Sequence, residues 1–585
     1  SALITDGSGS AVYFQKIGSA FTPPAGEFST LVTGTPSGGS GWTRRFPDST
    51  KVVFDATGKM TEVRDRFVNK TTVTYDGSGR VWQVKDPLNL TITLAYVTNG
   101  LSTITGPGSP GRVTNVTVDA SKRLTAIRDP DNISTFFGYD GSLRLSTITD
   151  RRGFTTTLGY DAQSGKLATI TSPAIPVYQV GTVSLITTLA AWQKRGVPYT
   201  LTSGTSFTPP LADTVKASVA EPGGGTTRFT VNRFGQPLLT VRPLGDTLAV
   251  TYTWGGQPTV IVRPGYGATD ADTIFYNTSG VPTYIRQARL TAVNIRYAAY
   301  AQADSTWGTD QAGVRNFIGS NGRLDSVRVG GVVVQRAFYN TRGQIDSLKD
   351  GNNVRTLKNL RLGTNSNLSE STYPLGASTY SSDSYGRRVS VTEPGRATQN
   401  VYYDLINHTD SIRDGVNPLP LKFVRDAMFD TSMTDPQRQV YRVARNALGW
   451  VTSRTDPVGA TAYAYYNIDG DAVHNTNRRG QAIDAVFDSL HRMTSSIGSL
   501  SMTWTYQNHG RVVIGSGGGV STETQYTNVF GKPDSVKTVM AGQTYWRRYG
   551  YTPAGRGDTV DISGGGLSFM GRKYLYNAAK GTLST

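Results

Sequence analysis

The side chains best suited to chemistry are a few histidines and one unusual pair of carboxylates. The four histidines of the chain are His408, His474, His491 and His509. They are not spaced as metal ligands usually are. Asp270 and Asp272 stand outside the repeat described below. Two carboxylates held across a sugar can hydrolyse a glycosidic bond, so this pair is the candidate for such an activity.

The standard catalytic and cofactor signatures are absent from the sequence. It contains no Gly-x-Ser-x-Gly elbow, no His-Glu-x-x-His motif and no P-loop, and its glycine runs lack a following Lys-Ser/Thr. There is no cysteine, which excludes disulfides and thiolate zinc sites. We therefore expect no enzyme, no catalytic residue, no metal and no cofactor. Calcium held by aspartate-rich loops stays an alternative, because their oxygens are hard ligands.

Most of the carboxylates belong to a repeating unit. In its clearest copy Tyr75 and Asp76 precede Gly79 and Arg80, and Asp86 follows the tyrosine by eleven residues. Alternating apolar residues flank the turn, in which aspartate bonds its own backbone and glycine supplies a positive φ. The unit is therefore predicted to be a β-hairpin. Its tyrosine is predicted to pack along the sheet with the hydroxyl on a polar partner, and glycan stacking is the alternative.

The hairpin unit recurs in phase along most of the chain. Further members of its structural signature are Tyr139, Asp140, Tyr339, Gly343, Tyr466 and Gly470. Steps of 21 residues separate Phe54, Tyr75 and Tyr96. Because a lone hairpin is only marginally stable, the units must stack side by side and extend one sheet. The sequence thus predicts an all-β chain built as a long array of hairpin repeats.

The repeated Tyr-Asp-x-x-Gly-Arg unit, its step and its Asp-Pro turns resemble the RHS/YD-repeat family. The family includes bacterial polymorphic-toxin shells, the C component of insecticidal toxin complexes and the teneurins. The resemblance implies a wide sheet that spirals into a hollow shell, which encloses a polypeptide in toxins and serves adhesion in teneurins. Two features depart from the family pattern. No core-closing segment rich in Asp-Pro-x-Gly is visible, so autoproteolysis is assigned to no residue, and the register is poor in part of the chain.

The repeat divides the chain into four segments. We expect lead-in strands over 1–41, the first part of the array over 42–175, an off-register insertion or plug over 176–222, and the second part over 223–585. Within the insertion, Leu185–Arg195 is the best candidate for a short helix. The chain begins with Ser1, without Met or a signal-peptide pattern, and we expect flanking segments. No apolar run is long enough for a transmembrane helix.

Charge suggests a class of partner. The chain has 59 Lys and Arg residues against 42 Asp and Glu, a formal net charge of +17, and its arginine pairs, such as 151–152, are scattered. A basic surface attracts polyanions. We expect a secreted or cell-surface bacterial scaffold that encloses a polypeptide cargo or joins an assembly partner protein. The alternative is an adhesion module for anionic glycan, nucleic acid or membrane.

Overall fold

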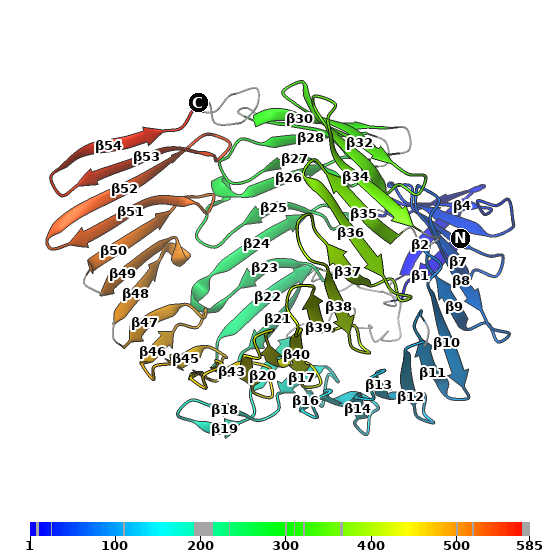
Figure 1. Ribbon diagram of the computed structural model, residues 1–585, viewed down its shortest axis with the longest axis horizontal. Coiled ribbons are helices and arrows are strands. Elements are labelled where there is room, and N and C mark those ends of the chain that lie inside the picture. The colour runs from blue at the N-terminus through cyan, green and yellow to red at the C-terminus, as the bar shows by residue number, and fades with distance from the viewer. Residues whose placement is uncertain are drawn as a thin grey trace, which may run out of the picture.

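The computed structural model describes residues 1–7, 11–24, 26–108, 111–191, 214–232, 235–298, 301–308, 311–319, 322–362, 367–498, 501–517 and 520–575. Strands make up 58% of the structure and helices 2%. One antiparallel sheet contains 49 strands. Consecutive strands pair along the chain, so the order of the sheet follows the sequence (Figure 1). The predicted all-β hairpin array is confirmed.

The N-terminal sheet comprises β1 Ala2–Thr5, β2 Ala11–Ile17 and β3 Ala20–Thr22. The chain then forms β4 Thr30–Thr33, β5 Trp42–Arg45, β6 Lys51–Phe54, β7 Met60–Arg64, β8 Lys70–Tyr75, β9 Val81–Lys85, β10 Thr91–Val97, β11 Gly100–Thr105, β12 Val113–Val118, β13 Leu124–Arg128, β14 Ser134–Tyr139, β15 Leu145–Thr149, β16 Thr155–Tyr160, β17 Leu167–Thr171, β18 Ile175–Val177, β19 Gly181–Val183, β20 Ile186–Ala191, β21 Thr214–Ala220, β22 Thr226–Asn232, β23 Pro237–Val241, β24 Thr247–Tyr252, β25 Pro258–Val262, β26 Asp272–Tyr276 and β27 Pro282–Arg286. The remaining strands are β28 Val293–Tyr297, β29 Ala303–Gly308, β30 Gln311–Ile318, β31 Leu324–Val329, β32 Val332–Tyr339, β33 Ile345–Asp350, β34 Arg355–Leu362, β35 Asn367–Tyr373, β36 Gly376–Ser382, β37 Arg388–Thr392, β38 Gln399–Tyr403, β39 Thr409–Asp414, β40 Leu421–Arg425, β41 Asp430–Thr434, β42 Val440–Arg445, β43 Val451–Thr455, β44 Thr461–Tyr466, β45 Ala472–Thr476, β46 Ala482–Phe487, β47 Met493–Ile497, β48 Met502–Gln507, β49 Val512–Gly517, β50 Val520–Thr527, β51 Pro533–Met540, β52 Gln543–Tyr551, β53 Gly557–Gly564 and β54 Leu567–Lys573. Short 3-10 helices are η1 Pro243–Gly245, η2 Ala268–Asp270 and η4 Asn508–Gly510.

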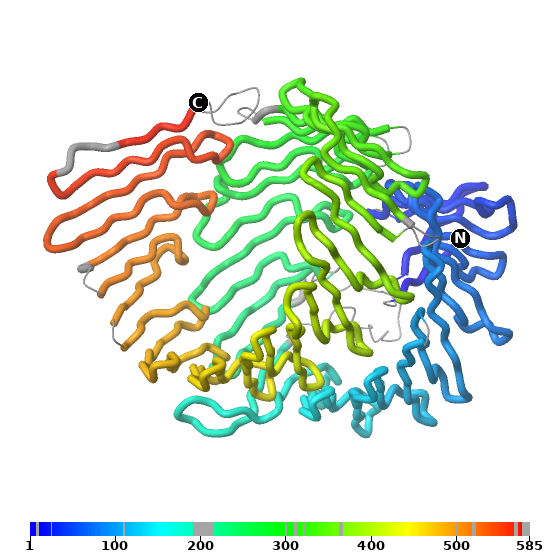
Figure 2. Tube along the Cα trace, viewed as in Figure 1, coloured from blue at the N-terminus to red at the C-terminus, as the bar shows by residue number. Residues whose placement is uncertain are grey.

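A β-bulge accompanies the repeat tyrosines. The pairing register shifts immediately before Tyr75, Tyr139, Tyr339 and Tyr466. A bulge bends its strand and increases the local twist, and twist accumulates from strand to strand. Because the bulge recurs with the repeat, its bends add up along the chain, which accounts for the curling path of the sheet in Figure 2.

The two faces of the sheet differ in chemistry. On one face, here called the aliphatic face, Val73 of β8 lies opposite Val84 of β9. Alternate residues of the same strands form the opposite face, here called the polar face, where Thr72 lies opposite Lys85. Val73 is only 7% exposed, because neighbouring side chains on the aliphatic face cover one another. The apolar core of the wall is therefore a layer of side chains on the aliphatic face, which continues from strand to strand.

Successive coils of the sheet meet at their turns. Side chains bridge positions between 246 and 296 residues apart. The contacts begin near Gly26, where an added Cβ would overlap Gly255. They continue to Thr291, whose amide donates to the Pro553 carbonyl at 2.7 Å. We call this line of turn-to-turn contacts the seam. At each contact, the residue with the lower number belongs to the earlier coil and the residue with the higher number to the later coil.

The segment expected as an insertion contributes a hairpin and two sheet strands. Strands β18 and β19 pair only with each other among the described residues, while β20 pairs with β17 and β21 and so returns the chain to the main sheet. The helix predicted over Leu185–Arg195 is wrong over β20, where Ile186, Thr187 and Thr188 are β-branched and favour extended backbone. Residues 192–195 lie outside the described part of the chain.

Candidate functional site

The repeat turn is built by one carboxylate. Asp76 Oδ1 accepts the backbone amides of Ser78 and Arg80, each at 2.9 Å, and Arg80 Nε donates to Asp76 Oδ2 at 2.8 Å. Gly79 has φ +77° and donates its amide to the Asp76 carbonyl at 2.9 Å. These donors, the Arg80 amide first, lower the pKa of Asp76. Both oxygens of the Asp76 carboxylate are thus hydrogen-bonded within its own turn.

The repeat tyrosine fastens each strand to the hairpin before it. The Tyr75 hydroxyl donates to the Met60 carbonyl at 2.7 Å. Three other signature tyrosines make the same bond across 15 residues: Tyr139 to Leu124, Tyr339 to Leu324 and Tyr466 to Val451. Burial raises the pKa of the Tyr75 and Tyr339 hydroxyls. They therefore stay protonated and act as structural donors.

The other signature residues serve their own turns in the same way. Asp86 Oδ1 accepts the amides of Leu88 and Leu90, each at 2.8 Å. Asp140 pairs with Arg144 as Asp76 does with Arg80. Gly343 and Gly470 have φ of +78° and +90°. The structure therefore leaves the signature residues distributed along the wall, one set to each hairpin.

The seam brings together arginines and aromatic rings that the sequence scatters. Four aromatic residues at the seam each have one arginine from either coil against the ring. The sets are Phe67 with Arg66 and Arg323, Tyr266 with Arg263 and Arg511, Tyr385 with Arg387 and Arg112, and Phe429 with Arg445 and Arg152. Each guanidinium carbon lies 4.5–5.0 Å from the ring centroid. We call these sets the seam clamps.

In the seam clamps, aromatic ring faces take the place of hydrogen-bond partners beside the arginine side chains. Five clamp arginines have a buried Nε atom without a hydrogen-bond partner among the described residues: Arg66, Arg112, Arg152, Arg263 and Arg445. Attraction between a guanidinium and a ring face is worth about 0.5–2 kcal/mol, with the larger values at desolvated sites. It therefore compensates part of the cost of burying these groups.

Arg152 makes the fullest set of contacts across the seam. Its Nη1 donates to the Asn446 carbonyl at 3.1 Å and its Nη2 to the Ala447 carbonyl at 2.5 Å. The ring of Phe154 lies on the same guanidinium, and the side chain is only 8% exposed. Sequence reasoning treated the 151–152 pair as surface charge. The sequence signal that could have revealed the seam clamps was an aromatic residue at the tip of a repeat turn, as in Asp383-Ser-Tyr385-Gly386.

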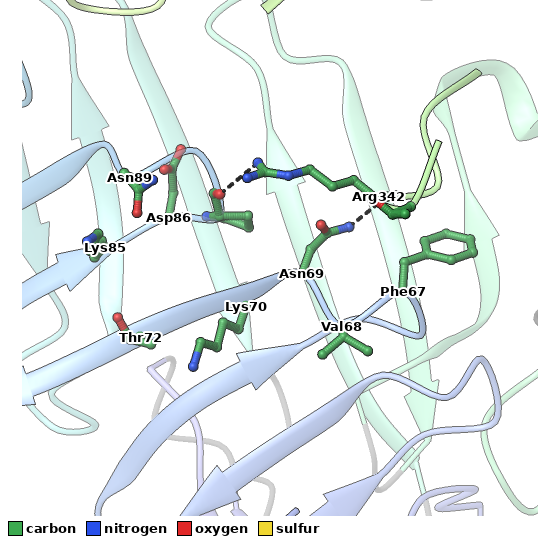
Figure 3. A pocket seen from close by; sticks show the side chains of 11 residues that line it. Phe67, Val68, Asn69, Lys70, Thr72, Lys85, Asp86, Asn89 and Arg342 are labelled. Atoms are coloured by element: carbon green, nitrogen blue, oxygen red, sulfur yellow. Dashed lines mark hydrogen bonds between the residues drawn. The ribbon is translucent and has the colours of Figure 1, made fainter. Parts of the chain in front are cut away.

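A cavity of about 460 Å³ lies at the seam beside the first clamp. Figure 3 shows Arg342 of the later coil reaching across it to the earlier coil, where Nη1 donates to the Pro87 carbonyl at 3.1 Å. Asn69 Nδ2 returns a hydrogen bond to the Arg342 carbonyl at 2.9 Å. Lys70 and Lys85 line the same cavity. Its lining is mostly polar and cationic, and the cross-coil hydrogen bonds make it a joint of the wall.

Three of the four histidines bridge the seam. His491 Nδ1 lies 2.9 Å from Asp471 Oδ1, and its Nε2 lies 3.2 Å from Glu221 Oε2 of the earlier coil. The hydrogen bond with Asp471 is the main cause that raises the pKa of His491. His509 Nδ1 lies 2.5 Å from Asp246 Oδ1. These histidines act as joints between coils.

The third bridging histidine meets the β18–β19 hairpin. Tyr178 donates its amide to the Tyr466 carbonyl at 2.8 Å, and its hydroxyl lies 3.2 Å from His474 Nδ1. The two rings stack at 4.8 Å, and Asp484 Oδ1 lies 2.6 Å from the same Nδ1. Ile175 and Val177 of β18 and Leu185 form a buried cluster with Ala447 of the later coil. The hairpin is therefore packed onto the seam.

The remaining candidates for chemistry are separated by their partners. His408 pairs with Asp404 in its own turn. Asp270 is buried and pairs with Arg289, whereas Asp272 accepts the Arg263 Nη2 at 3.0 Å. Each carboxylate thus has its own arginine. Within the described residues, no group of three or more His, Cys, Asp or Glu side chains could hold a metal ion. No helix there is long and apolar enough to span a membrane.

The fold and the seam define a repeat-built β wall. The family model named RHS Repeat matches residues 139–174, which cover the hairpins from the end of β14 to β17. The match confirms the predicted RHS/YD-type repeat in this part of the chain, and the structure is that of a repeat-built scaffold.

Comparison with solved structures gives distant likenesses. No curated protein sequence matches the chain. The crystal structure of TcdB2-TccC3-Cdc42 matches with 10% identity and TM-score 0.47 over 88% of this chain and 36% of that one. The Photorhabdus luminescens Tc holotoxin pore matches with 11% identity and TM-score 0.30, over 95% and 34% respectively. The chain thus spans about a third of the length of these chains.

Proposed function

We propose that this chain is a non-enzymatic wall segment of an extracellular bacterial shell that encloses a polypeptide or joins a larger assembly. The observation that carries the proposal is the seam. A sheet of 49 strands whose coils are fastened together by arginine clamps is a wall, and the signature turn carboxylates are engaged by the amides of their own turns. Contacts that fasten adjacent coils together are needed in a wall that must form a barrier around an enclosed polypeptide.

Cargo protection tests this function. The chain is produced with the segments that flank it in its gene, and the product is imaged by cryo-electron microscopy and treated with a broad protease. We expect one continuous coiled sheet and a flanking polypeptide that is cleaved only after the wall is denatured. Separate globular domains, or a flanking polypeptide digested at the same rate in both states, would refute the proposal.

Adhesion to an anionic glycan, nucleic acid or membrane is the second candidate. It rests on the net charge of +17. Binding of that kind weakens steeply as salt rises. If the chain does not bind heparin, DNA or anionic vesicles at low ionic strength, it does not have this function.

A further inference from the structure

One sector of the polar face carries a row of basic side chains. Strands β30 to β34 supply Arg315, Arg328, Arg336, Lys349 and Lys358 in that order. Arg315 is the register partner of Arg328, and Arg336 is that of Lys349. Arg328 and Arg336 are diagonal neighbours, and so are Lys349 and Lys358, because Ser326 and Ser347 hold the directly opposite positions. Diagonal neighbours lie about 7–8 Å apart, so the cations follow one another across the sheet. We call these five residues the basic row.

The basic row works against the stability of the sheet. Like charges directly opposite each other on antiparallel strands are destabilising. No salt bridge is found for any of the five residues within the described part of the chain. The repeat does not require these charges, since the corresponding register pairs of β15, β16 and β17 include Thr147 with Thr157 and Thr157 with Thr171. Opposed cations also occur in β6 to β8, where Lys51 and Arg64 and then Arg64 and Lys70 are register partners. There, however, Glu62 forms salt bridges with Arg64 and Lys70. Opposed cations without such a carboxylate are best explained by a partner.

Apolar side chains are interleaved with the row on the same face. Trp307, Phe338 and Leu360 are 46%, 42% and 47% exposed. Phe317 lies between Arg315 and Arg328, whose guanidinium carbons are 4.6 and 4.5 Å from its ring centroid. Those arginines are thereby held against the ring. Arginine and aromatic residues are the types enriched at protein interfaces and their hot spots.

We propose that the basic row and its interleaved apolar residues bind an acidic polypeptide segment that also carries apolar side chains. The cations complement carboxylates, and an arginine fork suits a carboxylate bidentately. The exposed aliphatic chain of Leu360 decides between polymers, because it needs an apolar partner that a phosphate or sugar backbone does not supply. The inference deepens the proposed function and rests on it, since the segment belongs to the enclosed or assembling polypeptide.

Binding of synthetic polypeptides tests the proposal on the full chain. The probes are fluorescent poly-glutamate and a glutamate–tyrosine copolymer matched in total charge, with heparin and oligo-dT as polyanions of other classes. We expect the copolymer to bind at least roughly tenfold more tightly than each of the other three. The triple variant R315Q/R328Q/K358Q should lose at least about tenfold in copolymer affinity, and L360S should weaken copolymer binding while leaving poly-glutamate binding unchanged.

A matched variant separates the row from general charge. R438Q/R479Q/R547Q also removes three exposed cations, which lie on other parts of the wall, and should change copolymer affinity less than about twofold. Equal losses in the two triple variants, or tighter binding of heparin or oligo-dT, would overturn the inference. Removing opposed cations relieves repulsion but also takes two cations off the Phe317 ring, so the first triple variant should keep the coiled sheet with little change in unfolding temperature. Loss of the coiled sheet itself would refute the proposed function, whereas absent binding to an intact wall refutes only this inference.

Discussion

Replacing Arg152 by methionine should open the seam locally. Methionine keeps much of the apolar stem but loses two charged donors and a cation on the Phe429 ring. Hydrogen bonds from charged groups contribute about 1.5–3 kcal/mol each, and a desolvated cation–ring contact about 0.5–2 kcal/mol. Because such contributions are not additive in one cluster, we expect a loss of about 4 kcal/mol. The side chain is 8% exposed, so solvent screens little of it.

Hydrogen exchange measures this opening directly. A loss of about 4 kcal/mol increases the open population by roughly three orders of magnitude, at about 1.4 kcal/mol per tenfold. Exchange should accelerate in the turn 446–450 and around Phe429 and remain unchanged in distant hairpins. The matched control is Arg80→Met, which removes the turn pair with Asp76 and the contact with Tyr96 but no contact across the seam. Exchange at 446–450 that is no faster in the Arg152 variant than in this control would refute the role of the clamp.

Three further perturbations test other parts of the wall. At His491, a doubly protonated ring can donate to both neighbouring carboxylates, whereas a neutral ring can donate to only one. Because the pKa of His491 is raised in the folded protein, the stabilisation from the second hydrogen bond is complete below the ordinary value of 6.5. It is lost as pH rises through the raised pKa. The drop in melting temperature caused by His491→Gln should therefore be larger at about pH 6 than at about pH 8.5, and an equal drop at both would contradict the bridge. Tyr139→Phe removes one hydroxyl donor and should lower the free energy of unfolding by about 0.5–1.5 kcal/mol in denaturant titration; no change would mean that the bond is not formed. Gly343→Ala and Gly459→Ala both place a side chain at positive φ, but only the Cβ at 343 would overlap the Phe67 ring, so its melting temperature should fall further by the equivalent of about 1–3 kcal/mol; equal losses would rule out close packing at that clamp.

The hairpin unit could be predicted because its causes are local. Asp76 accepts amides two and four residues away, and Gly79 is needed three residues after it. Such contacts leave a motif that repeats with the strand period, and this is why the sheet and the family resemblance were visible in the sequence. The helix prediction over Leu185–Arg195 was wrong because the contacts that decide this segment are not local. Its apolar spacing suits a helix, but the open edge of β17 offers β20 a full set of backbone partners.

The candidate site could not be predicted in the same way. Arg152 and Ala447 are 295 residues apart, and nothing in either turn specifies the other. Their meeting depends on the curvature summed over all the intervening hairpins, to which each bulge adds a small bend. The same holds for His491 and Glu221, which look like isolated surface residues in the sequence.

The sequence by itself determined the repeating unit, its strand pairing and the absence of any standard catalytic motif, because each depends on residues close together in the chain. The tertiary structure decided which turns meet, and so which arginines become buried clamps and that His491 gains a second carboxylate. It also decided that the cations of β30 to β34 form one row, since only strand register places residues from successive hairpins side by side. The physical reason is one of range: turn chemistry acts over a few residues, whereas coil-to-coil contact depends on the accumulated twist of the whole sheet.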